Sequence, residues 1–301
     1  MSDPEAGGAH PARPEAAATR PPPPEPLPAP VTDTHCHLDI ARQSRRDIGR
    51  GPDRALDAEG SLAEAAAVNV TRVVQIGTDL PGSARAITMA EAFDTVVAGV
   101  ALHPNEAPRL ADEGGLDDAL EQIDRLAGSS DRVRAIGETG MDHFRTGPEG
   151  RAAQEYSFRA HIEMARRHAK ALVIHDRDAH ADVLRVLEDS PLPESVVFHC
   201  YSGDADMARL CTERGWFLSF AGTLTFKNAS GLRDALAATP LDHLLVETDA
   251  PFLTPHPYRG KANAPYLIPL TVRTMAEVLD RDVRVVCDAL QHGTFRAFGS
   301  W

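Results

Sequence analysis

The sequence predicts an α/β protein folded as a (β/α)8 TIM barrel, and three observations lead to this prediction. After residue 30, eight short apolar runs alternate with eight amphipathic segments. The length of 301 residues suits one such barrel with an added tail. Most of the apolar runs end in ionisable residues, and parallel barrels place their functional groups at the C-terminal ends of their strands.

The expected strands are short and apolar, as in buried parallel sheets. They cover residues 31–39, 72–79, 96–104, 133–142, 171–178, 195–203, 216–226 and 243–251. Residues with helical periodicity lie between them and after the last, at 61–68, 83–93, 116–127, 152–169, 179–189, 204–215, 231–239 and 270–280. A doubly wound open sheet is the alternative, but it usually has fewer strands, and no glycine-rich dinucleotide turn follows the first run.

Residues 1–30 have the composition of a disordered or polyproline-like segment. They contain ten of the 23 prolines, four of them consecutive at 21–24. Such a segment cannot bury enough apolar surface to offset the entropy lost on ordering. We therefore expect a solvated tail over 1–30 and a folded domain over 31–301, with no obligatory protein partner. A proline-motif ligand is the alternative interpretation of the tail.

The overall charge and the cysteines narrow the class of protein. A formal net charge of -13 argues against a protein that coats nucleic acid electrostatically. It is compatible with a nucleic-acid enzyme, because bound divalent metals would offset several charges locally. The four cysteines form no CxxC pair, and neither a signal peptide nor a run of about 18 apolar residues occurs. These features predict a reduced, cytoplasmic protein without membrane spans.

Residue types that bind metals gather at the ends of the expected strands. Because these ends meet at one rim of a parallel barrel, we expect their side chains to lie together. Imidazoles with carboxylates suit Zn²⁺, Mn²⁺ or Fe²⁺, and a site richer in carboxylates and water suits Mg²⁺. The sequence thus predicts a metal centre and leaves the ion open. The candidate ligands are His35, His37, Glu138, His175, His199 and Asp249.

The alternation of side chains along a strand separates the members of the His35-Cys36-His37 triplet. The two histidines point to one face and Cys36 to the other. If the histidines face the barrel interior, Cys36 faces the helices and is a small buried hydrophobe, not a ligand or a reactive thiol. Glu138 ends an apolar strand, where a carboxylate is costly to bury unless it is paired or metal-bound.

Cations at the same strand ends suit an anionic substrate such as a phosphodiester. They are Arg145, Arg177 and Lys227, and ordinary surface ion pairing is the alternative for each. His103, in the segment ALHPN, is a candidate for a metal ligand, a phosphate donor or a structural hydrogen-bonding residue. We favour a role facing the substrate.

These residues together resemble the TatD family of metal-dependent deoxyribonucleases, which belong to the amidohydrolase-type, metallo-dependent hydrolase barrels. The resemblance runs from about Thr32 to Phe298. It rests on several motifs in order, which makes it specific. The motifs are DTHCHLD, LHPNEA, IGETGMD, VIHDRDA, FHCYSG, SFAGTLTFKNA, VETDAPFLTP and RGKANAP.

The resemblance implies a pair of divalent ions, Mg²⁺, Mn²⁺ or Zn²⁺, bridged by Glu138. It implies that His35, His37 and Asp249 surround one ion. His175 and His199 would surround the other.

The implied activity is a deoxyribonuclease that hydrolyses DNA phosphodiester bonds by two-metal activation of water. Glu138 and Asp249 would be catalytic, with Asp249 orienting or deprotonating the water. Arg145, Arg177 and Lys227 would hold the phosphate. Family members are described as acting often from 3′ ends, so exonuclease action on single-stranded or frayed DNA is expected.

The chain departs from the commoner family pattern near the expected substrate contacts. His143-Phe144 stands where an aromatic pair often follows, Asn105 where a second histidine often occurs, and Ala264 where an acidic residue is frequent.

Two other functions fit parts of the sequence. A barrel hydrolase of an ester, lactone or amide often uses a carbamylated lysine on the fourth strand, where this chain has Glu138. A non-catalytic, metal-stabilised scaffold would use the proline-rich tail for contacts. Ligand types on several strands, with cations nearby, favour an enzyme over such a scaffold.

Overall fold

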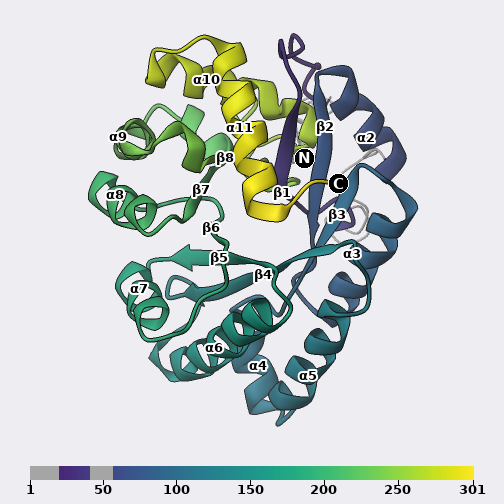
Figure 1. The fold of residues 1–301 in the computed structure, drawn as a ribbon, viewed down its shortest axis with the longest axis vertical. Helices are drawn as coiled ribbons and strands as arrows, with labels where there is room; N and C mark the ends of the chain where they lie inside the picture. Colours follow the sequence, from purple (N-terminus) through teal and green to yellow (C-terminus); the bar gives the residue numbers. More distant parts are fainter. Residues whose placement is uncertain (1–19, 41–56) are drawn as a thin grey trace, which may run out of the picture.

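The computed structural model describes residues 20–40 and 57–301. Eight parallel strands form one sheet in the order β1 to β8, and helices surround it (Figure 1). The predicted (β/α)8 barrel is confirmed. The strands are β1 Val31–Cys36, β2 Val70–Ile76, β3 Val96–Val100, β4 Val133–Asp142, β5 Ala171–Arg177, β6 Val196–Phe198, β7 Phe217–Phe220 and β8 Leu244–Val246.

The helices outside the barrel follow the strands in alternation (Figure 1). The α-helices of the described residues are α2 Ala58–Ala67, α3 Leu80–Ala92, α4 Glu106–Asp112, α5 Leu116–Ala127, α6 Arg151–Arg167, α7 His180–Glu188, α8 Ala205–Glu213, α9 Ser230–Ala238, α10 Ile268–Leu279 and α11 Val283–Phe298. The 3-10 helices are η1 Pro148–Gly150, η2 Gly222–Thr225, η3 Leu241–His243 and η4 Pro265–Leu267. All eight strands and all eight helices expected from the sequence are present.

Two helices, α4 and α11, were not expected. Helix α4 has only seven residues and contains Pro108 in its first turn, so its periodic signal is short. Helix α11 carries Gly293 and Thr294 on its buried side, and both have low helix propensity. A Cβ at Gly293 would lie 2.6 Å from the carbonyl oxygen of Leu244, so the glycine allows α11 to approach β8 closely.

The barrel is closed between β1 and β8 by a few specific hydrogen bonds. The amide of His37 donates to the carbonyl of Ala250 over 2.8 Å, and the amide of Asp249 donates to the carbonyl of His35 over 2.9 Å. The hydroxyl of Thr34 also donates to a β8 carbonyl, over 3.0 Å. The seam that closes the barrel therefore fixes three of the candidate ligands relative to one another.

Apolar side chains fill the interior of the barrel near its N-terminal end. They include Val74, Val97, Val173, Val197, Phe217 and Leu245. Phe298 of α11 packs into this cluster, and Trp301 covers it in part. On the outer face of β1, Cys36 is buried against Val73 and Ala250, beside Leu62 and Met89 of the helices. The expectation that Cys36 faces the helices is confirmed.

Residues 20–30 pack against the barrel instead of extending into solvent. Leu27 and Ala29 are buried. The hydroxyl of Tyr266 donates to the carbonyl of Pro21 over 2.6 Å, and other carbonyls of the segment accept from arginine side chains of α10 and α11. The expected disordered tail over 1–30 is therefore wrong for residues 20–30, because neighbouring helices satisfy their carbonyls and cover Leu27. Residues 1–19 lie outside the described part of the chain.

Candidate metal centre

Glu138 lies at the centre of a cluster of imidazoles at the C-terminal end of the barrel. Strand β4 delivers it, and its side chain is buried. Gly140, two residues later, has a φ of +136°, and a Cβ there would lie 2.1 Å from the carbonyl oxygen of His175. The glycine thus lets β4 and β5 approach closely enough for the Glu138 carboxylate to reach His175 Nδ1, at 2.6 Å.

A first group of candidate ligands lies around Glu138 Oε2. His35 Nε2 lies 3.4 Å from this oxygen and His37 Nε2 lies 3.8 Å from it. Asp249 Oδ1 is 3.3 Å from His37 Nε2. The other ring nitrogen of His37, Nδ1, donates to the carbonyl of Ile76 over 2.9 Å, so Nε2 is left with a lone pair that faces the carboxylates.

A second group forms around Glu138 Oε1. His199 Nε2 lies 3.0 Å from this oxygen, and His175 Nδ1 is the nitrogen of its ring that faces the same atom. The rings of His35 and His199 stack with centroids 3.7 Å apart, which brings the two groups together on one carboxylate. The structure therefore assembles all six predicted ligands, with Glu138 between the two groups.

Buried carboxylates orient both histidines of the second group. Glu247 Oε1 is 3.0 Å from His199 Nδ1 and also accepts the amide of Cys200 over 2.8 Å. Asp142 Oδ2 is 3.3 Å from His175 Nε2. Each carboxylate fixes which ring nitrogen faces Glu138, as is usual for ligands of protein-bound metals.

Glu247 and Asp142 are not among the residues to which the sequence pattern assigned a role. Glu247 could have been found from its place directly after the apolar run 244–246, where a carboxylate is costly to bury unless it is paired. The role of Asp142 could not be predicted from local sequence, because its position depends on tertiary contacts. Asp142 accepts from the side chain of Asn105 over 3.1 Å, and its amide donates to Gln154 of α6 over 3.1 Å.

Two further residues, Asp33 and Thr248, fix the backbone next to Asp249. Asp33 is fully buried and accepts the amide of Thr248 over 2.9 Å and its hydroxyl over 2.5 Å. Burial raises the pKa of Asp33 to about 7, although the hydrogen bonds from Thr248 oppose this shift. Asp249 itself has a φ of +55°, which is unfavourable for a residue with a side chain. The hydrogen bonds between Thr248 and Asp33 hold Asp249 in this conformation.

The electrostatics of the cluster favour an ionised Glu138. Burial tends to raise the pKa of this carboxyl, but the charges of His199 and His103 outweigh burial. The pKa of Glu138 consequently lies well below its usual range. A buried carboxylate surrounded by imidazoles is therefore negative at neutral pH and available to a cation.

The imidazoles differ in their affinity for protons. Burial lowers the pKa of His199, but the Glu247 charge and the other carboxylate beside it raise it well above its usual range. Burial likewise opposes the protonation of His37, but Asp249 raises its pKa to about 9. Burial and the charge of His199 both lower the pKa of His35. A metal ion bound here would replace protons on some of these rings.

The donor set fits divalent metal ions. Both ring nitrogens of His35 are buried without a hydrogen-bond partner in the structure. Ligand atoms of His35, His37 and Glu138 lie within 4.8 Å of one another, as do those of His103, Glu138 and His175. Buried polar atoms without partners are costly, and coordination through His35 Nε2, the nitrogen that faces Glu138, would satisfy one of the two.

The predicted substrate residues lie at the same rim. His103 Nε2 is 3.4 Å from Glu138 Oε1, and its Nδ1 accepts the amide of Asn105 over 3.1 Å. Arg145 follows β4, Arg177 ends β5, and Lys227 follows η2. The side chains of these three cations are exposed. Their contacts with a phosphate stay a prediction.

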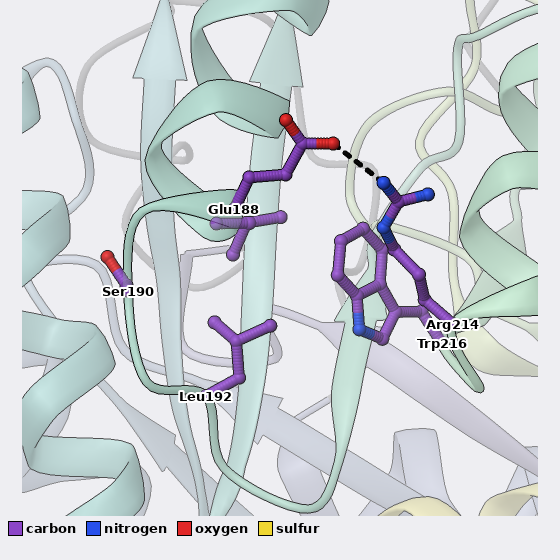
Figure 2. Close-up of a pocket in the computed structure, with 6 residues that line it drawn as sticks. Glu188, Ser190, Leu192, Arg214 and Trp216 are labelled. Carbon is purple, nitrogen blue, oxygen red and sulfur yellow. Dashed lines mark hydrogen bonds and ion pairs between the residues drawn. The ribbon is translucent and has the colours of Figure 1, made fainter.

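A shallow depression with a volume of about 470 Å³ lies elsewhere, on the outside of the barrel. Figure 2 shows Glu188, Ser190, Leu192, Arg214 and Trp216 around it, with an ion pair between Glu188 and Arg214. The two charged atoms are 2.6 Å apart. The two charged residues of the depression pair with each other, and its lining contains no histidine. It therefore lacks the group of imidazoles and carboxylates that surrounds Glu138.

The motifs and the geometry agree with a comparison to known families. A family model described as TatD related DNase matches residues 32–299. The chain belongs to the TatD family. It is accordingly a metal-dependent hydrolase of that family, as the resemblance implied.

Relatives in several bacteria share most of the chain. The TatD protein of Mycobacterium tuberculosis, named an uncharacterized metal-dependent hydrolase, is 42% identical over 275 residues, covering 89% of this chain and 98% of its own length. YcfH of Escherichia coli, which carries the same description, is 37% identical over 251 residues, 83% of this chain and 86% of its own.

Solved structures support the barrel. YjjV, a TatD homologue from Escherichia coli, superposes with a TM-score of 0.79 at 27% identity, covering 90% of this chain and 98% of its own. The lactonase Lmo2620 of Listeria monocytogenes has a TM-score of 0.61 at 15% identity, covering 91% and 96%, a likeness of fold alone. In the described residues, every helix is too short or too polar to cross a membrane.

Proposed function

We propose that the protein is a deoxyribonuclease that hydrolyses DNA phosphodiester bonds, acting from the 3′ ends of single-stranded or frayed DNA. The observation that carries this proposal is the buried Glu138 carboxylate shared by two groups of ligands. Two divalent ions held this way would lower the pKa of the attacking water and stabilise the charge that develops on the phosphate. Mg²⁺, Mn²⁺ and Zn²⁺ all suit the mixed carboxylate and imidazole ligands.

We propose that Glu138 bridges the ions, with His35, His37 and Asp249 on one side and His175 and His199 on the other. The orientation of the rings supports this assignment. His37 and His199 would use Nε2, while His175 would use Nδ1, because its Nε2 faces Asp142. Each ring then has its other nitrogen directed to an oxygen of the protein.

Asp249 is the proposed base. Its carboxylate is partly accessible at the rim, whereas Glu138 is more deeply buried. The bond from its amide to the His35 carbonyl holds its position in spite of the unfavourable φ, so it is placed to orient the attacking water and accept its proton.

His103 is proposed to donate a hydrogen bond to the phosphate. Its Nδ1 accepts the Asn105 amide, so the neutral ring carries its proton on Nε2, the nitrogen directed into the site. A protonated nitrogen cannot ligate a metal but can donate to an anionic oxygen. Arg145, Arg177 and Lys227 would pair with the phosphates from the rim.

A direct test compares substrates. The full chain is incubated with Mn²⁺ or Mg²⁺ and a 5′-labelled single-stranded oligonucleotide, and in parallel with a panel of lactones and amides. Stepwise shortening of the oligonucleotide from its 3′ end, abolished by EDTA, is the expected result. Turnover of a lactone or amide with inert DNA would overturn the proposal in favour of a carbonyl hydrolase.

A cytoplasmic location completes the proposal. All four cysteines are free, and three of them are buried in the structure. Thiols kept in the reduced state are usual in that compartment.

A further inference from the structure

Phe144 is the most exposed large apolar side chain in the described part of the chain. Its exposed fraction is 62%, and three other large hydrophobic residues there are comparably exposed: Tyr156 at 54%, Phe252 at 50% and Val285 at 46%. Phe144 lies two residues after the end of β4, at the end of the barrel that holds the candidate metal centre. An aromatic ring that contributes so little burial to the fold is available to a ligand.

The ring is held in place although it is exposed. The guanidinium carbon of Arg177 lies 3.9 Å from the centroid of the Phe144 ring. The adjacent amide of His143 donates to the carbonyl of Arg177 over 2.9 Å, and the amide of Arg145 donates to Asp142 Oδ1 over 2.8 Å. The residues on both sides of Phe144 are thus anchored, and a ligand would meet a preformed surface.

This surface lies directly beyond the second group of ligands. Strands β4 and β5 pair Gly140 with His175 and Asp142 with Arg177. Arg177 therefore shares a strand face with His175 and lies roughly 7 Å further along the strand. Because Asp142 Oδ2 contacts His175 Nε2 at 3.3 Å, the turn that carries Phe144 starts at the metal centre.

We propose that Phe144 and Arg177 form a stacking site for one unpaired nucleobase next to the phosphodiester bond that is hydrolysed. This inference rests on the proposed nuclease function and adds a substrate subsite to it. An exposed aromatic ring stacks on any base, and an arginine on its face adds a cation for the phosphate backbone. In a duplex the faces of each base are covered by its neighbours. Only single-stranded or frayed DNA could use the site.

The test uses Phe144→Leu, which keeps an apolar side chain but removes the aromatic face. Tyr156→Leu is the matched control, because Tyr156 is a similarly exposed aromatic on α6 whose hydroxyl donates to Asp117 of α5 and not to a residue of the metal centre. KM is measured on a single-stranded oligonucleotide and on the same oligonucleotide with abasic positions beside the cleaved bond. A 2-aminopurine base at those positions reports stacking by fluorescence quenching without any cleavage.

Phe144→Leu is expected to raise KM for the normal oligonucleotide by about 5- to 150-fold, to leave the abasic substrate unaffected and to remove the quenching. Tyr156→Leu should change none of these, and Phe144→Trp should retain stacking. Unchanged KM and quenching in Phe144→Leu, with wild-type DNA cleavage intact, would overturn the stacking site alone. A change in sedimentation instead of DNA binding would identify the ring as a protein contact and also overturn it. Inert DNA with the wild-type protein would instead refute the nuclease function itself.

Discussion

The two ends of the barrel use the same eight strands but bury opposite kinds of side chain. At the N-terminal end, Phe217, Leu245 and their neighbours pack with Phe298 of the last helix. At the C-terminal end, the same strands continue into buried imidazoles and carboxylates around Glu138. Apolar burial stabilises the first end, whereas the second holds polar groups without partners, such as both ring nitrogens of His35.

This contrast predicts that the N-terminal end of the barrel contributes stability and that the C-terminal end contributes the metal centre. Substitutions at the N-terminal end should change stability and spare the metal centre. Substitutions at the C-terminal end should change metal binding and spare the fold.

The largest effect is expected for Glu138→Gln. The amide keeps the volume of the side chain but removes the charge that both groups of ligands share, so hydrolytic activity should fall by at least about 100-fold. Metal-dependent activity and the circular dichroism spectrum are measured together. Glu155→Gln, a change of the same kind on α6, is the control. Retained activity in a folded Glu138→Gln protein would contradict the shared-carboxylate arrangement.

The next effect concerns the opposite end of the barrel. Phe298→Ala removes a buried ring from the interior cluster and should lower the free energy of unfolding by about 3 to 5 kcal/mol. Urea denaturation measures this change, with Val285→Ala on the exposed side of the same helix as control. Metal affinity at a temperature well below unfolding should match the wild type. A parallel loss of affinity would show that the two ends are coupled.

The third prediction concerns the contribution of residues 20–30 to the stability of the fold. Leu27→Ala should lower the free energy of unfolding by about 2 kcal/mol, since Leu27 is buried against the barrel. Glu25→Ala, at an exposed position of the same segment, should have almost no effect. Equal midpoints of urea denaturation for the two variants would mean that the segment does not pack stably in solution.

A smaller effect is expected for Glu247→Gln. Its carboxylate orients His199 without being one of the six proposed ligands, so the affinity for Mn²⁺ should fall about 10- to 100-fold while two ions still bind. Isothermal titration calorimetry gives the affinity and the stoichiometry. Loss of one ion altogether would instead make Glu247 a ligand.

The smallest effect is a pH dependence on the outer surface. Hydrogen bonds from Arg185 and Arg159 lower the pKa of Glu155 to about 2, despite partial burial. A lowered pKa in the folded state stabilises the protein above the usual pKa of about 4.5, and this contribution is lost as the pH falls from there towards 2. Glu155→Gln should cost less than about 1 kcal/mol at pH 7, and the difference from wild type should shrink over that interval. A constant difference would contradict the assignment.

The sequence was sufficient for the barrel and for the convergence of the six candidate ligands. Alternation of apolar runs with helical segments predicted the strands, and strand ends such as His35 and Asp249 predicted the rim. Both follow from local periodicity and from one general property of parallel barrels.

The remaining features depend on contacts between distant segments. The orientation of His175 requires Asp142, which is itself held by Asn105 and Gln154 from other elements. The packing of residues 20–30 could not be predicted from their composition, because it depends on carbonyl groups that accept from Arg273 and Arg284.

The most direct test of the two-ion site is anomalous diffraction from crystals of the full chain soaked in Mn²⁺. Two peaks that share Glu138 are expected at the C-terminal end of the barrel. One should lie beside His35, His37 and Asp249, and the other beside His175 and His199. A single peak, or two peaks that do not share the Glu138 carboxylate, would contradict this arrangement.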